Sequence, residues 1–464
     1  MRRSPALIVM MLLASSLPVA AAEGPYVRRG TPRREGRFWT EMDACFVPVK
    51  PGGRLVLRAD RGTVTVVPGA DSDKLQCEVK LLAFTPSDTD ARPFFSRALL
   101  AARRAPADGA YLELKLPSRD PLAGRIGAFF SIQVPRHFNL DLQTQDGGIQ
   151  VCGLNGDLRA STAGGDIRSG DLTGAVRVET GGGNITLGNI GQRLDARTAG
   201  GSIRVGDVKG DVDLVSNGGD IVAGMISGSA HAQTAAGDIV LRGASGPVTA
   251  ETDGGQIQLG QCGSSVRADT AAGSIHLDGA RGRVQAQTGG GSIDLLQVMG
   301  AVQAQTLMGN ILAQIDAGHD AFSASSLRST MGDVHVFVPP DLPLTVNALI
   351  ESGIGHVIAS DFPLTMRRQS PGDLGLGFVQ GVGALAGGGP PLSLRTSLGS
   401  IEIRKEDART LARVKASQLE FWRMWQEQAK EQAQALEVLR QVMQEQQQRL
   451  EQMQKVLTDD GGQQ

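Results

Sequence analysis

The chain has 464 residues, with 46 lysines and arginines against 48 aspartates and glutamates and a formal net charge of −2. This balance gives no physical reason to expect nucleic acid or an acidic membrane surface as a partner. Only 4% of the residues are aromatic, and the sequence has no basic run with interleaved aromatics, so it offers no support for nucleic-acid binding.

The first 22 residues have the pattern of a secretory signal peptide. Arg2 and Arg3 precede an apolar stretch from Ala6 to Leu17 that is too short to span a bilayer, and residues 20–22 supply an A-x-A cleavage site. No cysteine follows this site, and no later stretch reaches transmembrane length. We therefore expect an exported chain without a transmembrane segment once mature, located in the periplasm, at the cell surface or outside the cell.

Two regions precede the regular part of the chain. Residues 23–37 are polar and basic, and we expect a disordered linker there. Residues 38–140 alternate polar and apolar positions as strands do and predict a β region that caps the repeats that follow. Within this region, the stretch Phe94–Arg104 has helical character.

The cysteines predict one disulfide at most. Cys152 and Cys262 are separated by about six repeats, or roughly 29 Å at one strand spacing per repeat. Bridged Cα atoms lie within about 7 Å of each other, so this pair cannot bond. Cys45 and Cys77 form the candidate disulfide if the chain is exported to an oxidising compartment, and four unpaired thiols are the alternative.

Residues 141–338 repeat with a period of 18. The row that defines the period is Ile149, Ile167, Ile185, Ile203, Ile221, Ile239, Ile257, Ile275, Ile293 and Ile311. A glycine stands two residues before each isoleucine, and a threonine or serine stands five before it. A fixed period of about 20 residues is typical of a solenoid, in which each unit contacts mainly its neighbours.

Within each repeat the apolar residues lie two apart, which is the period of a strand. Glycines recur at three places, as at Gly201, Gly206 and Gly210, and predict corners. Three corner rows suggest a three-sided coil, and a flattened two-sided coil is the alternative. The fold class predicted is therefore all-β, a parallel β-solenoid with 18-residue coils, with the threonine row as a hydroxyl ladder at or just inside one corner.

Residues 339–404 predict a C-terminal β region. Strand patterns recur at 344–346, 355–358 and 400–403. The stretch Gly372–Pro391 is rich in glycine, and we expect a mobile loop.

Residues 405–464 change character and predict a coiled coil or long amphipathic helix, about 75–80 Å in length, with a polar tail. Glutamate, glutamine and arginine fill most other positions, and the predicted association seam is formed by Trp422, Trp425, Ala429, Leu436, Leu439, Met443, Leu450, Met453 and Leu457. An apolar stripe requires a partner. The segment either associates with another chain or folds back onto the solenoid as a cap anchored by Phe421 and the two tryptophans.

The repeat units resemble a known family. Residues 198–203 and 288–293, together with the ending Gly332-Asp333-Val334-His335-Val336, are similar to the β-strand repeat of a bacterial family labelled putative adhesins. The resemblance covers roughly residues 45–403. It implies a β-solenoid in an exported or envelope-associated protein and supplies no catalytic residues.

A search for chemistry along the repeats finds one acidic pair. Asp220 and Asp238 precede neighbouring isoleucines and would lie about 5 Å apart, a spacing also found in retaining glycosidases. The simpler interpretation is that short polar side chains beside a corner glycine satisfy local backbone groups. Aspartate occupies this row too rarely for a calcium-binding roll, and residues 141–318 contain no aromatic side chain for stacking sugars.

The sequence thus favours a non-enzymatic, exported β-solenoid that acts as an envelope scaffold or adhesin-like binding surface. We expect no catalytic, cofactor-binding or metal-binding residues. A protein partner or self-association would use the C-terminal helix, and the rod would take an envelope or surface ligand. The alternatives are a carbohydrate-active β-helix enzyme and an envelope-stress regulator that acts through a protein partner.

Overall fold

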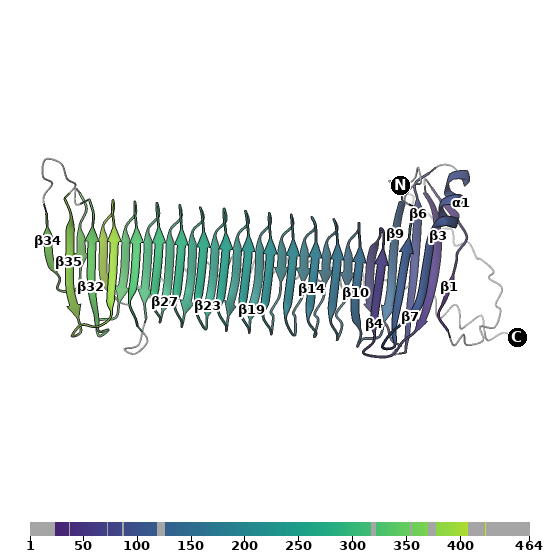
Figure 1. The fold of residues 1–464 in the computed structure, drawn as a ribbon, viewed down its shortest axis with the longest axis horizontal. Coiled ribbons are helices and arrows are strands. Elements are labelled where there is room, and N and C mark those ends of the chain that lie inside the picture. The colour runs from purple at the N-terminus through teal and green to yellow at the C-terminus, as the bar shows by residue number, and fades with distance from the viewer. Residues whose placement is uncertain are drawn as a thin grey trace, which may run out of the picture.

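In the computed structural model, the described residues are 24–406 except 37, 72, 86–87, 118–125, 317–321, 353–354 and 370–376, together with residue 423. Nearly all of them belong to strands stacked into an elongated rod, and α1 (Asp88–Arg97) lies at one end of it (Figure 1). The predicted signal peptide lies outside the described residues. So does the predicted C-terminal helix beyond residue 406, except for Arg423, which is helical and exposed.

The strands form two sheets that run the length of the rod. In spatial order after its first strands, sheet A contains β9 (Ile126–Val134), β5 (Thr63–Pro68), β11 (Ile149–Val151), β13 (Ile167–Ser169), β15 (Ile185–Leu187), β17 (Ile203–Val205), β19 (Ile221–Ile226), β21 (Ile239–Ala244), β23 (Ile257–Cys262), β25 (Ile275–Ala280), β27 (Ile293–Val298), β29 (Ile311–Ile315), β31 (Val334–Val338), β37 (Ile401–Lys405) and β33 (Ile358–Ser360).

Sheet B follows the same axis on the opposite side of the core. It contains β7 (Leu99–Ala105), β8 (Gly109–Lys115), β4 (Arg54–Ala59), β10 (Asn139–Thr144), β12 (Leu158–Thr162), β14 (Val176–Thr180), β16 (Leu194–Thr198), β18 (Val212–Ser216), β20 (Ala230–Thr234), β22 (Val248–Thr252), β24 (Val266–Thr270), β26 (Val284–Thr288), β28 (Val302–Thr306), β30 (Ser325–Ser329), β36 (Pro391–Thr396), β32 (Leu344–Ile350), β35 (Val379–Leu385) and β34 (Thr365–Arg368).

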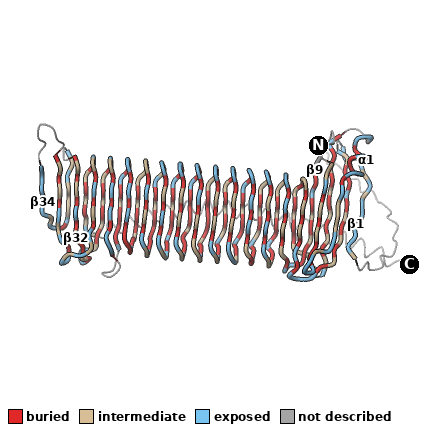
Figure 2. The backbone as a smooth tube through the Cα atoms, in the orientation of Figure 1, coloured by how far each residue is buried: buried red, intermediate tan, exposed pale blue. Residues whose placement is uncertain are grey.

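The register of the repeats follows the 18-residue period. Ile185 pairs with Ile203 in sheet A, and Thr180 pairs with Thr198 in sheet B, both in parallel. The isoleucine row is at most 1% exposed along its whole length, and buried residues alternate with outward ones in both sheets (Figure 2). Burying one such side chain is worth about 1.5–3 kcal/mol, so the stacked row stabilises every interface between coils. The predicted parallel β-solenoid is therefore the observed architecture.

The cross-section has two sheets, not the three that the corner glycines suggested. In the first coils a third side exists only as isolated bridges, which join Leu154, Leu172, Ile190, Val208 and Ile226. From β19 onward the strand of sheet A continues through this position, so the third side merges with sheet A. A side this short has room for one paired residue, which explains why three corners do not produce three sheets.

Antiparallel strands close the N-terminal end. There β3 (Phe38–Pro48) pairs with β6 (Lys74–Ala83) and also with β1 (Tyr26–Arg28) and β2 (Arg33–Glu35). The expectation of disorder over residues 23–37 is thus wrong for these two strands, because the edge of β3 supplies their hydrogen-bond partners. The helical expectation at 94–104 is also shifted: α1 ends at Arg97, and β7 begins at Leu99.

The C-terminal end departs from chain order. Strand β36 inserts between β30 and β32 and pairs in parallel with both. Strand β35 lies within the stretch 372–391 that was expected to be a loop, and it pairs antiparallel with β32 and β34. That expectation is therefore wrong for Val379–Leu385, where tertiary pairing overrides the glycine content.

Candidate binding surface

The Asp220–Asp238 pair is engaged in the backbone of the rod. Asp238 donates its backbone N–H to Asp220 Oδ1 (3.0 Å), and Gln256 donates its own to Asp238 Oδ1 (2.7 Å). The same contact recurs along the row, as where Asn184 donates to Asp166 Oδ1 (2.8 Å). Each side chain thus caps the next coil, which is the structural interpretation made from the sequence.

The threonine row forms the predicted hydroxyl ladder. Thr198 Oγ1 donates to the carbonyl of Gly183 in the preceding coil (2.9 Å) and accepts the N–H of Gly201 (3.2 Å). Ser216 makes the equivalent pair of bonds one coil further on. These hydroxyls are buried, so they stabilise the corner of the rod by joining neighbouring coils and are not accessible to a ligand.

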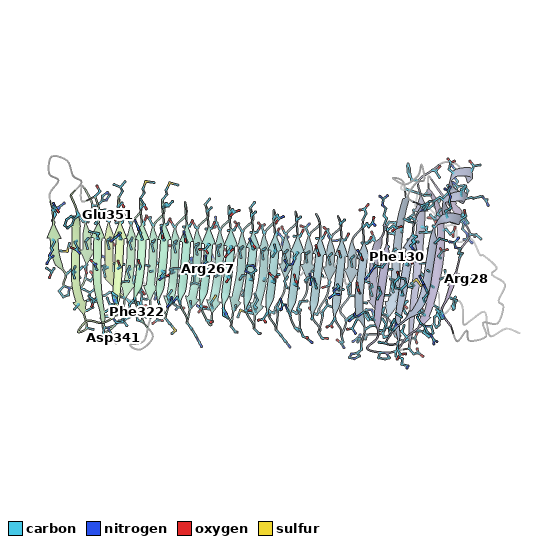
Figure 3. All side chains as sticks on the ribbon, viewed as in Figure 1. Arg28, Phe130, Arg267, Phe322, Asp341 and Glu351 are labelled. Carbon is cyan, nitrogen blue, oxygen red and sulfur yellow. A yellow bond between two sulfur atoms is a disulfide. The ribbon has the colours of Figure 1, made fainter. Side chains whose placement is uncertain are left out.

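The outer face of sheet B carries the most charge along the rod. Its outward rows hold arginines and carboxylates on neighbouring coils, where strands are about 4.8 Å apart. Arg197 Nε lies 2.9 Å from Asp195 Oδ1, and its Nη2 also contacts Asp213 Oδ2. Further along, Arg267 Nε lies 2.8 Å from Asp269 Oδ2 and 3.8 Å from Glu251 Oε1; Arg267 is labelled near the middle of the rod in Figure 3.

Two shallow depressions lie along this face. The first has a volume of about 290 Å³, and its charged lining is Arg54, Asp141, Asp157, Arg159, Arg177, Arg193 and Asp195. The second, of about 650 Å³, spans the coils from β18 to β26, and its polar lining includes Asn217, Gln233, Glu251, Arg267, Asp269 and Gln287. Both are open and carry charged side chains in their lining, which suits an extended ligand better than a small enclosed one.

The ion pairs on this face are available to a ligand. The side chains of Arg177, Arg197 and Arg267 remain 43–59% exposed. Exposed ion pairs of this kind contribute only about 0–1 kcal/mol, so exchanging their partners for ligand groups costs little. Arginine presents a planar fork of donors that matches carboxylates and other oxygen pairs. The surface can thus bind acidic or hydroxyl-rich polymers through hydrogen bonds, without aromatic stacking.

The predicted disulfide residues are paired across the cap. Cys45 in β3 and Cys77 in β6 are directly opposite in register and bonded, with a Cα–Cα distance of 5.0 Å. Cys152 and Cys262 are buried free thiols, and burial raises the pKa of each to about 12. A thiol with so high a pKa is a poor nucleophile at neutral pH. The predicted association seam, from Trp422 to Leu457, lies outside the described residues.

A buried acidic cluster in the cap was missed at the sequence level. Glu41 and Asp43 are 4% and 1% exposed, and Asp43 Oδ1 accepts the backbone N–H of Gly30 (3.0 Å). Burial, followed by the nearby Asp43 carboxylate, raises the pKa of Glu41 to about 7, and the charge of Arg29 opposes this shift. The sequence did contain a signal for this cluster. Glu41, Asp43 and the buried Cys45 lie two residues apart on one strand, so their side chains face the same side.

Among the described residues, no group of three or more histidines, cysteines, aspartates or glutamates is arranged to hold a metal ion. In the same part of the chain, no helix is long and apolar enough to cross a membrane.

The strand register thus defines a protein class, the two-sheeted parallel β-solenoid. No protein-family model matches the chain, and no curated protein matches it. A solved structure described as a putative cell adhesion protein from Clostridium sporogenes ATCC 15579 is similar over 81% of this chain and 100% of that one, at 9% identity and a TM-score of 0.14. The assignment of the class therefore rests on the strand pairing of this chain itself.

Proposed function

We propose that this protein is an exported, non-enzymatic scaffold of the cell envelope, and that the outer face of sheet B binds an extended, polar envelope ligand. The observation that carries the proposal is the charged outer face of sheet B, with exposed arginines on the neighbouring strands β14 and β16 and again on β24. Solenoids commonly bind partners along such extended surfaces.

Location in the envelope is supported by two independent features. The first 22 residues have the pattern of a signal peptide. The Cys45–Cys77 disulfide suits an oxidising compartment, such as the periplasm or the cell surface. The non-enzymatic assignment is supported by the corner row, because Asp220 and Asp238 both accept hydrogen bonds from the backbone of the rod.

The test is co-sedimentation of the purified mature chain with isolated cell envelopes. Arg177→Glu combined with Arg197→Glu should weaken binding by about tenfold or more, because a lost charge-assisted contact is worth about 1.4 kcal/mol or more. The matched control is Lys50→Glu combined with Lys74→Glu, which reverses two charges in the cap near exposed or half-exposed ion pairs.

Equal binding by both double variants would remove sheet B as the binding surface. Release of reducing ends from envelope polysaccharide by the wild-type chain, lost in Asp220→Asn with Asp238→Asn, would favour the carbohydrate-active enzyme instead.

A further inference from the structure

The outer face of sheet A is less exposed than an uncovered sheet face should be. Val222 and Val240 point outward on neighbouring strands, yet they are only 5% and 6% exposed and form an apolar pair separate from the main core. Val215 is also an outward valine, but it lies on sheet B and is only half-buried. Outward apolar side chains this well buried are typical of a face that packs against another element.

Polar residues on the same face are also shielded from water. Gln314 in β29 is 1% exposed. Burial raises the pKa of Asp294 in β27, against an opposing effect of His276, and burial alone raises the pKa of Glu78 in β6. From β11 to β31 the first outward residue of each strand of this face, from Gln150 to His335, is half-buried or buried, so low exposure extends along the repeats.

The chain leaves the last coil in the direction of this face. After β37 ends at Lys405, Glu406 donates its backbone N–H to the carbonyl of Val338 in β31 (3.1 Å). Its carboxylate oxygen Oε1 then accepts a hydrogen bond from Gln314 Nε2. Because β29 lies two strands back from β37, the side chain of Glu406 already reaches toward the N-terminal end over sheet A.

The length of the remaining chain matches the length of the face. From β37 back to β3, sheet A contains fifteen successive strand pairings, or roughly 72 Å. Residues 407–458 would span about 78 Å as a helix. The heptad pattern of this segment provides the apolar stripe that the face requires.

We propose that residues 407–458 form a single helix that folds back and packs along the outer face of sheet A, with its seam residues against Val222 and Val240. The occupant of this face is therefore the chain's own C-terminal segment. This arrangement leaves the outer face of sheet B as the open binding surface, and it holds whether or not sheet B binds an envelope ligand.

The geometry sets a register for this packing. Strand β21, which carries Val240, is six pairings from β37, or about 29 Å. Trp425 follows Glu406 by 19 residues, or about 28 Å of helix. Strand β19, which carries Val222, lies one pairing further, at about 34 Å, and Ala429 falls at about the same distance. In this register Trp425 lies against Val240, and Ala429 lies against Val222 on the neighbouring strand.

The experiment compares Val240→Lys with Val215→Lys in the full mature chain. Val240→Lys buries a charge beneath Trp425, so tryptophan emission should shift to longer wavelength, and tryptic cleavage after residue 406 should become at least about tenfold faster. Val215→Lys makes the same change on sheet B and should behave as wild type. A double variant in the segment, Leu436→Glu with Leu439→Glu, should reproduce both effects without touching the rod.

Three results would overturn the proposal. One is cleavage of the wild-type segment as fast as that of the Leu436→Glu, Leu439→Glu variant. Another is a Val240→Lys variant whose tryptophan emission wavelength and rate of tryptic cleavage both equal those of the wild type. The third is an oligomer in light scattering that dissociates in the Leu436→Glu, Leu439→Glu variant, because the helix would then pair with other chains.

Discussion

Glu41 illustrates how a single buried group makes the cap sensitive to pH. Its pKa is raised from 4.5 to about 7 by burial and by Asp43. The folded state therefore holds a proton that the unfolded state releases between about pH 4.5 and pH 7. Stability is highest below this window and falls as pH rises through it.

Glu41→Gln should remove this dependence, because the amide cannot ionise. Each pKa unit corresponds to about 1.4 kcal/mol, so the wild-type loss up to pH 8 is at most about 3 kcal/mol. Above pH 7 the variant should unfold at a higher temperature than the wild type, measured by circular dichroism as a function of pH. The matched control is Glu179→Gln, on the exposed face of sheet B. If the unfolding temperature of Glu41→Gln falls with pH as steeply as that of the wild type, another group causes the pH dependence.

At the scale of the element, the corner beside the threonine row depends on close backbone approach. A Cβ added at Gly201 would lie 2.1 Å from the carbonyl oxygen of Gly183 in the preceding coil, a distance that forces the coils apart. A Cβ at neighbouring Gly200 would meet nothing closer than 3.6 Å. Gly201 belongs to the row of glycines that stand two residues before each isoleucine, whereas the position of Gly200 holds alanine in other repeats, as at Ala236 and Ala272, so only Gly201 is required by the stacking.

Gly201→Ala should therefore lower the free energy of unfolding by about 2–4 kcal/mol, as expected when backbone must shift in a packed coil. Gly200→Ala, one residue away, should change it by less than about 1 kcal/mol. Urea denaturation of both variants measures the difference. Equal losses would mean that the corner geometry differs from the one described.

The elements that the sequence predicted correctly are those with local signals. The 18-residue period predicted which residues pair, because a stacked coil repeats its register at every unit, as in Ile185 and Ile203. Strand β35 was missed because its interleaved glycines resemble a loop, and only its pairing with β32 makes it a strand. Successive side chains of a strand point alternately to the core and to the outer face. The outward positions of Arg197 and Arg267 on sheet B could therefore have been predicted from the alternation of apolar and polar residues.

At the scale of the whole molecule, the two sheets make one continuous rod. Sheet B contains 18 strands in the described residues, and its 17 spacings amount to roughly 82 Å. Its middle is parallel, and antiparallel strands lie at both ends, where β7 pairs with β8 and β34 with β35. Each coil is stabilised mainly by its neighbours, so the rod is a quasi-linear array.

Small-angle X-ray scattering of the purified mature chain tests this account most directly. The rod, with the C-terminal helix folded along sheet A, predicts a monomer with a longest dimension of about 85–100 Å. A compact globule of this size would have a longest dimension of about 60 Å, which would contradict the stacked rod. A dimension near 160 Å would leave the rod intact but place the helix beyond its end, against the packing proposed for sheet A.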